Sequence, residues 1–136
     1  MHAMKLILSA TLLAASTQVS AITGSEFLAR CDGLNKAPED ETPQQAVDRA
    51  LQAGSCIGIV GGVVQGVNLV GSMLQAQKAT TRQFVCLPDG VQATELLELV
   101  LSDLRKQPAD AGAQAPAHIY RSIMARYACP ADTATD

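Results

Sequence analysis

The chain has 136 residues, a formal net charge of −3 at pH 7 and no tryptophan, and aromatic residues make up only 3% of the sequence. Nucleic-acid binding needs phosphate-neutralising cations and aromatic stacking surfaces, and the chain has neither a basic stripe nor an aromatic cluster. The composition therefore excludes a nucleic-acid partner, whereas a weakly acidic chain is compatible with a basic protein partner.

Residues 1–21 are typical of a cleaved secretory signal peptide. Lys5 supplies a positive charge, residues 6–15 are apolar or small, and Val19-Ser20-Ala21 is a small-residue cleavage pattern. The apolar run is too short to cross a bilayer of about 30 Å as a helix. We therefore expect export to the periplasm, with cleavage after Ala21.

The rest of the chain is predicted to form one domain over 22–130, followed by a disordered tail over 131–136. Small exported domains have a modest core and often depend on disulfides. An even number of cysteines in such a chain predicts two disulfides, and the sequence by itself permits three ways of pairing them. The absence of a C-x-x-C motif disfavours a zinc knuckle or a redox-active pair. The four cysteines are Cys31, Cys56, Cys86 and Cys129.

Two helix starts are marked by capping boxes. Thr23-Gly24-Ser25-Glu26 predicts a short helix that ends at Asp32-Gly33. Thr42-Pro43-Gln44-Gln45 predicts a longer one, since threonine caps well and proline suits the first helical position. Between the two helices lies a polar loop over 33–41, which carries the acidic run Glu39-Asp40-Glu41.

The segment 57–74 is apolar nearly all round, which is typical of a helix that is buried on every side. It is rich in valine, isoleucine and glycine, so two strands that turn at Gly61-Gly62 are the alternative. Its length and the lack of strict alternation favour the helix. Each of its glycines lowers helix stability by about 1 kcal/mol relative to alanine, which leaves a kink or break within 43–76 open.

Four glycines in this region recur every fourth residue and would form a ridge without side chains on a helix: Gly54, Gly58, Gly62 and Gly66. Such a ridge allows another backbone to approach closely. We interpret the segment as a central core helix whose glycines admit neighbouring helices. The alternative is a transmembrane helix over 57–74, which the polar residues Gln65, Asn68 and Ser72 disfavour.

The C-terminal half of the chain predicts two amphipathic helices. The first runs from about Gln92 to Lys106 and follows a turn-rich segment. The second runs from Pro116 to about Tyr127, after an alanine-rich linker. Apolar residues recur at helical spacing on one face of each helix, namely Leu97, Val100, Leu101 and Leu104 in the first, and Tyr120, Ile123, Met124 and Tyr127 in the second.

The chain offers no arrangement of residues for catalysis or metal binding. A nucleophile needs a base, and His118 is the only histidine of the expected mature domain. Cysteines held in disulfides are not nucleophiles, and no histidines or carboxylates show the spacing of metal ligands. We therefore predict neither an enzyme nor a metal- or cofactor-binding protein, and interpret His118 as an ordinary surface or partly buried residue.

Charged loop residues are the remaining candidates for contact with a protein partner. The loop over 33–42 is acidic, and the polar connection over 77–85 carries two cations. Acidic residues before a helix also stabilise its positive N-terminus, so these charges alone do not choose between a structural and a binding role. The candidate partner-binding residues are Glu39, Asp40, Glu41, Lys78 and Arg82.

Several short motifs follow one another along the chain: Leu28-Ala29-Arg30-Cys31, the glycine-containing stretch over 56–63, Cys86-Leu87-Pro88-Asp89-Gly90-Val91, and the terminal Cys129-Pro130. In this order they resemble the Rap/Tai family of periplasmic immunity proteins, which neutralise type VI secretion amidase effectors. Ile59 and Gln65 depart from the family pattern, which usually has tyrosine and aspartate there.

The resemblance implies an all-α, four-helix domain stapled by two disulfides, Cys31–Cys56 and Cys86–Cys129. It further implies a protein that binds and occludes a secreted peptidoglycan amidase, often as a homodimer, and that has no chemistry of its own. The contact would be made by an exposed loop or helix end. A glycine-ridged structural protein of the envelope or membrane is the alternative function, and a periplasmic chaperone-like binder is a third.

Overall fold

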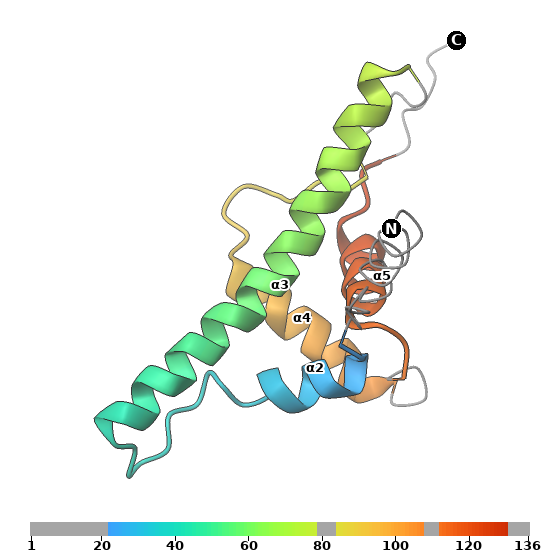
Figure 1. The fold of residues 1–136 in the computed structure, drawn as a ribbon. Coiled ribbons are helices and arrows are strands. Elements are labelled where there is room, and N and C mark those ends of the chain that lie inside the picture. The colour runs from blue at the N-terminus through green and yellow to red at the C-terminus, as the bar shows by residue number, and fades with distance from the viewer. Residues whose placement is uncertain (1–21, 79–83, 108–111, 131–136) are drawn as a thin grey trace, which may run out of the picture.

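The computed structural model describes residues 22–78, 84–107 and 112–130. Over these residues the fold is all-α, as predicted, with four helices and two disulfides. Residues 1–21 and 131–136, on which the signal peptide and the tail were predicted, lie outside the described residues. The helices are α2 (Gly24–Cys31), α3 (Pro43–Ala76), α4 (Ala93–Lys106) and α5 (Ala115–Tyr127) (Figure 1).

Both predicted capping boxes are present. The Thr23 hydroxyl accepts a hydrogen bond from the Glu26 amide at 3.2 Å, and the Glu26 carboxylate accepts one from the Thr23 amide at 2.8 Å. Thr42 and Gln45 form the same reciprocal pair at the start of α3. Because these bonds satisfy amide groups that the helix itself leaves unpaired, the local sequence determines where α2 and α3 begin.

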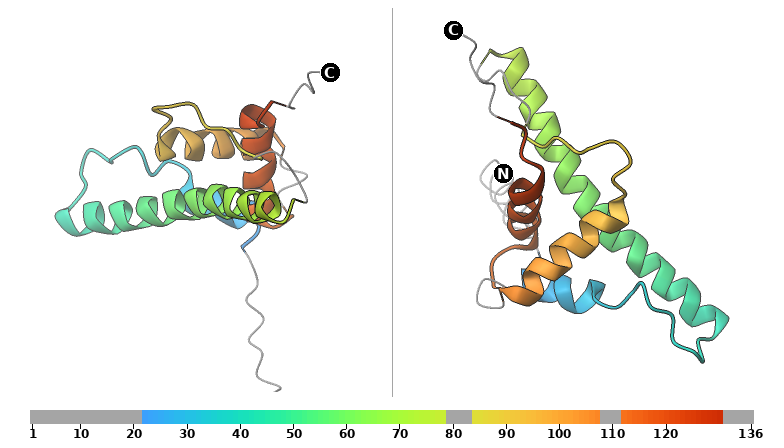
Figure 2. Two further views of the ribbon diagram at one scale, coloured as in Figure 1. Left: turned by 90° about the horizontal axis from the view of Figure 1, so that it is seen from above. Right: turned by 180° about the vertical axis from the view of Figure 1, so that it is seen from behind.

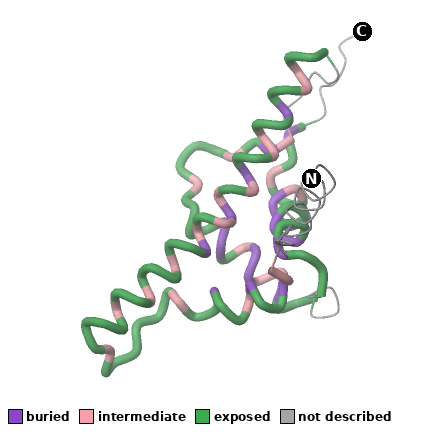
Figure 3. The backbone as a smooth tube through the Cα atoms, in the orientation of Figure 1, coloured by how far each residue is buried: buried purple, intermediate pink, exposed green. Residues whose placement is uncertain are grey.

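The hydrophobic core lies where α2, α4 and α5 pack together and against one side of α3 (Figures 2 and 3). The predicted apolar face of α4 is buried, which confirms its periodicity. The predicted face of α5 is partly wrong, because Tyr120 is 39% exposed and the helix is rotated so that Ile119 is fully buried instead. The largest fully buried side chains are Phe27, Leu101, Ile119, Ile123, Val60 and Val100.

Helix α3 is one continuous helix of 34 residues. The alternative of two strands that turn at Gly61-Gly62 is therefore wrong, and the helix is not interrupted at its glycines. The expectation that it is a central core helix is also wrong. Only one face of α3 is buried, and its buried residues are Cys56, Val60, Val64 and Gly71.

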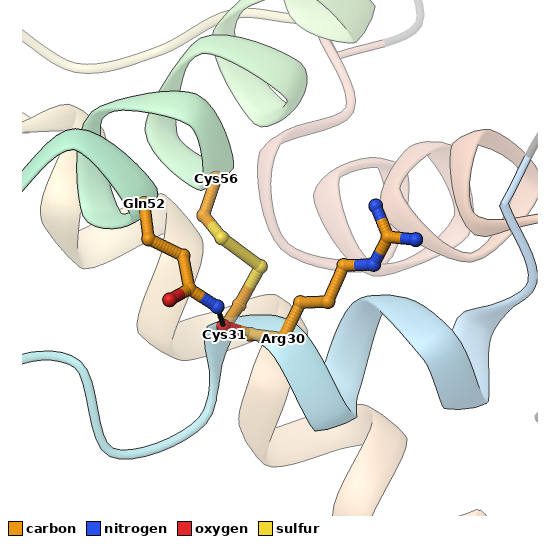
Figure 4. The surroundings of a disulfide bond; sticks show 4 residues. All are labelled: Arg30, Cys31, Gln52 and Cys56. Carbon is orange, nitrogen blue, oxygen red and sulfur yellow. Dashed lines mark hydrogen bonds between the residues drawn. A yellow bond between two sulfur atoms is a disulfide. The ribbon is translucent and has the colours of Figure 1, made fainter. Parts of the chain in front are cut away.

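The two disulfides join Cys31 to Cys56 and Cys86 to Cys129, which is the pairing that the family resemblance implies. The first ties the end of the short helix α2 to the middle of α3, and beside it the Gln52 side-chain amide donates to the Arg30 carbonyl at 2.6 Å (Figure 4). The second ties the segment before α4 to the residues after α5. Each disulfide thus joins parts of the core that lie far apart in the sequence.

Candidate protein-interaction surfaces

The loop over 33–42 and the N-terminal turns of α3 project away from the body of the domain (Figure 1). This projecting loop carries Glu39 and Asp40, which are both exposed and form no ion pair with any described residue. Exposed charges on a projecting loop are available for electrostatic contact with another protein.

Arg49 anchors the projecting loop to α3. Its guanidinium donates to both carboxylate oxygens of Glu41, at 2.7 and 2.9 Å, and to the Leu34 carbonyl at 3.1 Å. The hydrogen bonds from Arg49 lower the pKa of the Glu41 carboxyl. Glu41 therefore has a structural role in the loop, whereas the other two acids of the run face solvent.

We expect replacement of Arg49 with methionine to loosen the loop and to speed tryptic cleavage after Lys36 severalfold. The methionine keeps much of the apolar stem but cannot donate to Glu41 or Leu34. Arg126→Met is the matched control, because Arg126 is exposed on α5 and has no ion pair with a described residue. Equal cleavage rates in the two variants would contradict the anchoring role.

The same ion pair predicts how the loop responds to acid. The folded pKa of Glu41 lies below its ordinary value, so the folded state binds fewer protons there than the unfolded chain. The stabilisation is complete above about pH 5 and is lost as the pH falls below the ordinary glutamate pKa of about 4.3. The measurement is the protection of backbone amides over 33–42 from hydrogen exchange, compared at several pH values. We expect Glu41→Gln to remove the dependence of this protection on pH, because glutamine does not titrate.

Of the two predicted cationic candidates, Lys78 lies at the end of α3 opposite to the projecting loop. Lys78 follows the C-terminus of α3, is exposed, and has a left-handed backbone conformation with φ of 57°. Arg82 lies outside the described residues. A helix of 34 residues is roughly 51 Å long, so Lys78 and the acidic loop do not share one site within a single copy of the chain.

A small polar pocket of about 210 Å³ lies between the end of α4 and α5, and it holds His118. This residue is 6% exposed, so it is more buried than the sequence analysis expected. The Arg121 guanidinium lies 3.1 Å from His118 Nδ1, and this contact helps to hold the buried ring in place.

Metal binding finds no support in the described ranges 22–78, 84–107 and 112–130, where no group of three or more histidine, cysteine or acidic side chains gathers.

The outward face of α3 is a second exposed surface, which sequence reasoning placed in the core. An alanine Cβ at Gly54, Gly58, Gly62 or Gly66 would meet no described atom within 4 Å, so the glycine ridge faces open space. No charged residue occurs between Arg49 and Lys78. Five large apolar side chains of this helix are more than half exposed, namely Val47, Leu51, Leu69, Val70 and Met73.

An apolar groove of about 370 Å³ borders this face. By length and composition α3 is long and apolar enough to cross a membrane. Only 17% of its 18-residue apolar window is buried in the fold. Its buried face packs against α2, α4 and α5, so lipid does not have access to the whole circumference of the helix. The groove is lined by Val63, Gly66, Val67, Val70, Phe84 and Tyr120.

Comparison with protein families finds a match that covers most of the chain. Residues 23–129 match the Rap1a immunity proteins, and this range contains all four helices and both disulfides. No curated protein and no solved structure matches the chain. Immunity proteins bind a protein effector, and two disulfides suit a protein that acts outside the cytoplasm. From the match over 23–129, the chain belongs to the family of Rap1a immunity proteins.

Proposed function

We propose that this protein is a periplasmic immunity protein that binds a peptidoglycan amidase effector of a type VI secretion system and occludes its catalytic cleft. The family match over 23–129 carries this proposal. The signal-like segment over 1–21 and the two disulfides support the periplasm as the compartment. Inhibition is steric, so the protein needs no catalytic group of its own.

The projecting loop over 33–42 is the element that enters the cleft. Its base is held rigid by the Arg49 anchor and by the Thr42 capping box, so little conformational entropy is lost when it binds. Its tip carries Glu39 and Asp40, whose charges complement a basic rim on the effector. Charge complementarity of this kind speeds association and selects the partner.

The test is a pull-down with the mature, oxidised domain against the secreted proteins of its own strain, followed by an amidase assay on the captured protein. We expect one peptidoglycan amidase to be captured and inhibited. Capture of no amidase, or of an amidase that stays fully active, would reject the proposed function.

Charge reversal then tests the loop. We expect Asp40→Lys to weaken inhibition by about tenfold or more, because like charges at an interface cost several kcal/mol. Asp89→Lys makes the same change of charge in an exposed turn before α4 and is expected to leave inhibition unchanged. Equal inhibition by the two variants would remove the loop from the contact while leaving the immunity function standing.

A further inference from the structure

The two disulfides differ in their access to solvent. Cys31 and Cys56 are each only 2% exposed, and they belong to the hydrophobic core between α2 and α3 (Figure 4). Cys86 and Cys129 are not part of that core. Cys129 is 8% exposed, but Cys86 is an exposed residue in the segment before α4. The core disulfide is therefore closed to a reagent while the domain is folded, whereas the other disulfide presents one of its two cysteines to solvent.

We propose that the Cys86–Cys129 disulfide is a redox site, which a dithiol protein with a thioredoxin-like active site reduces and re-forms while the core disulfide stays intact. Thiol–disulfide exchange begins when a thiolate attacks one sulfur of the disulfide, so its rate depends on access to that sulfur. Exposed disulfides are the labile ones, whereas structural disulfides resist reduction. Cys86 is the residue that the attacking thiolate reaches, because its partner Cys129 is buried.

The exchange proceeds in two steps. A thiolate of the dithiol protein attacks Cys86 Sγ, the bond to Cys129 Sγ breaks, and the electron pair leaves with Cys129, which takes up a proton from water. Cys86 is then joined to the dithiol protein by a mixed disulfide. The second thiolate of that protein attacks the sulfur of its own first cysteine and releases Cys86, which is protonated in turn. The dithiol is thus oxidised to a disulfide, and the disulfide of this chain is reduced to two thiols.

The disulfide joins two short segments that are also paired through their backbones. Cys86 N donates to the Tyr127 carbonyl at 2.9 Å, and Cys129 N donates to the Phe84 carbonyl at 3.1 Å. These bonds belong to an isolated antiparallel bridge. Since two paired segments without further strands are only marginally stable in water, the pairing depends on the cross-link. Reduction is therefore expected to loosen this pairing and to leave the helical core in place.

The pairing also positions Phe84 against α3. A Cβ at Gly71 would lie 3.1 Å from Phe84 Cδ2, so the ring packs directly on the helix, and it lines the apolar groove together with Tyr120. The Phe84 carbonyl is one of the groups that hold this segment to Cys129. Loosening the pairing frees Phe84 to leave the helix, so the redox state of the disulfide controls one wall of the groove.

The inference stands apart from the proposed function, because it is tested on the isolated mature, oxidised protein without effector. The protein is treated with dithiothreitol, quenched at intervals with iodoacetamide and mapped by mass spectrometry of its peptides. We expect Cys86 and Cys129 to be alkylated at least about tenfold faster than Cys31 and Cys56, so that a species with one disulfide accumulates. In guanidinium chloride the two rates are expected to become similar, because neither disulfide is then buried.

A trapping experiment identifies the sulfur that is attacked. The probe is reduced thioredoxin in which serine replaces the second active-site cysteine, so the mixed disulfide of the first step is not resolved. We expect this probe to be linked to Cys86, because Cys129 is buried.

Hydrogen exchange of the one-disulfide species tests whether the release is local. We expect the amides of Cys86 and Cys129 to lose protection, because their hydrogen bonds join the two released segments. The amides of α4 are the internal control and are expected to stay protected, because α4 packs in the core beside the disulfide that remains.

Three results would overturn the inference. The first is reduction of both disulfides at the same rate in the folded protein. The second is a thioredoxin probe that is trapped on a cysteine other than Cys86, or on none. The third is a one-disulfide species whose α4 amides exchange as fast as the amide of Cys86, which would mean that reduction unfolds the domain and that the disulfide is only structural.

Discussion

Replacing both Cys86 and Cys129 with alanine is expected to lower the free energy of unfolding by about 4 kcal/mol. The disulfide closes a loop with a sequence separation of 43 residues, and a cross-link of this length removes about that much loop-closure entropy from the unfolded chain. It also holds the segment before α4 against the end of α5, where Cys86 N donates to the Tyr127 carbonyl at 2.9 Å and Cys129 N donates to the Phe84 carbonyl at 3.1 Å.

The measurement is equilibrium unfolding in urea, followed by far-UV circular dichroism. The matched variant Cys31→Ala/Cys56→Ala removes the other disulfide, whose sequence separation is 25 residues, and is expected to cost about 3.5 kcal/mol. Since a domain of this size is stable by about 5–15 kcal/mol, removing both disulfides is expected to remove about half of that stability or more. A loss of less than about 1 kcal/mol for the Cys86 and Cys129 variant would contradict the stabilising role.

Gly24→Ala is expected to destabilise the domain by about 1–3 kcal/mol, because the added methyl group overpacks a tight contact. A Cβ at this position would lie 2.8 Å from His118 Cδ2 and 3.0 Å from Leu104 Cδ2. Gly24 is the first residue of α2, and its amide also donates to the Ala113 carbonyl at 2.8 Å, so the backbone has little freedom to move away.

Urea unfolding again measures the effect, with Gly112→Ala as the control. Gly112 is exposed, has open space around the position of a Cβ and does not have a positive φ. Its replacement is expected to be neutral or to stabilise by up to about 1 kcal/mol through the unfolded chain. If both variants lost the same free energy of unfolding, the loss would come from replacing a glycine with alanine at any position, and not from the contact of Gly24 with His118.

Local chemistry was readable from the sequence. The capping residues Thr23 and Thr42 predicted where α2 and α3 begin, because a cap acts on amides within three residues of itself. The apolar periodicity of α4 predicted its buried face, since one stripe of a helix is enough to reach a single core. The count of four cysteines predicted two disulfides, but their pairing came from the family resemblance, as did the expectation of a protein partner.

The candidate site was only partly readable. The sequence located the acidic loop over 33–42 but treated its three acids alike, and only the folded chain distinguishes Glu41, which Arg49 binds, from Glu39 and Asp40. Arg49 itself was missed. It is eight residues from Glu41 and fifteen from Leu34, so no local pattern links it to either one.

The largest difference between expectation and structure concerns α3. Its composition, apolar nearly all round and free of charge over 50–77, predicted a helix covered on every side, whereas the tertiary structure covers one face and leaves the glycine ridge open. The sequence by itself determined the helices, their starts and the number of disulfides, because these depend on neighbouring residues. Which face of α3 is buried was decided only by the tertiary structure, because α3 is apolar on every side and its burial depends on distant segments such as α5 and Phe84 that pack against one face.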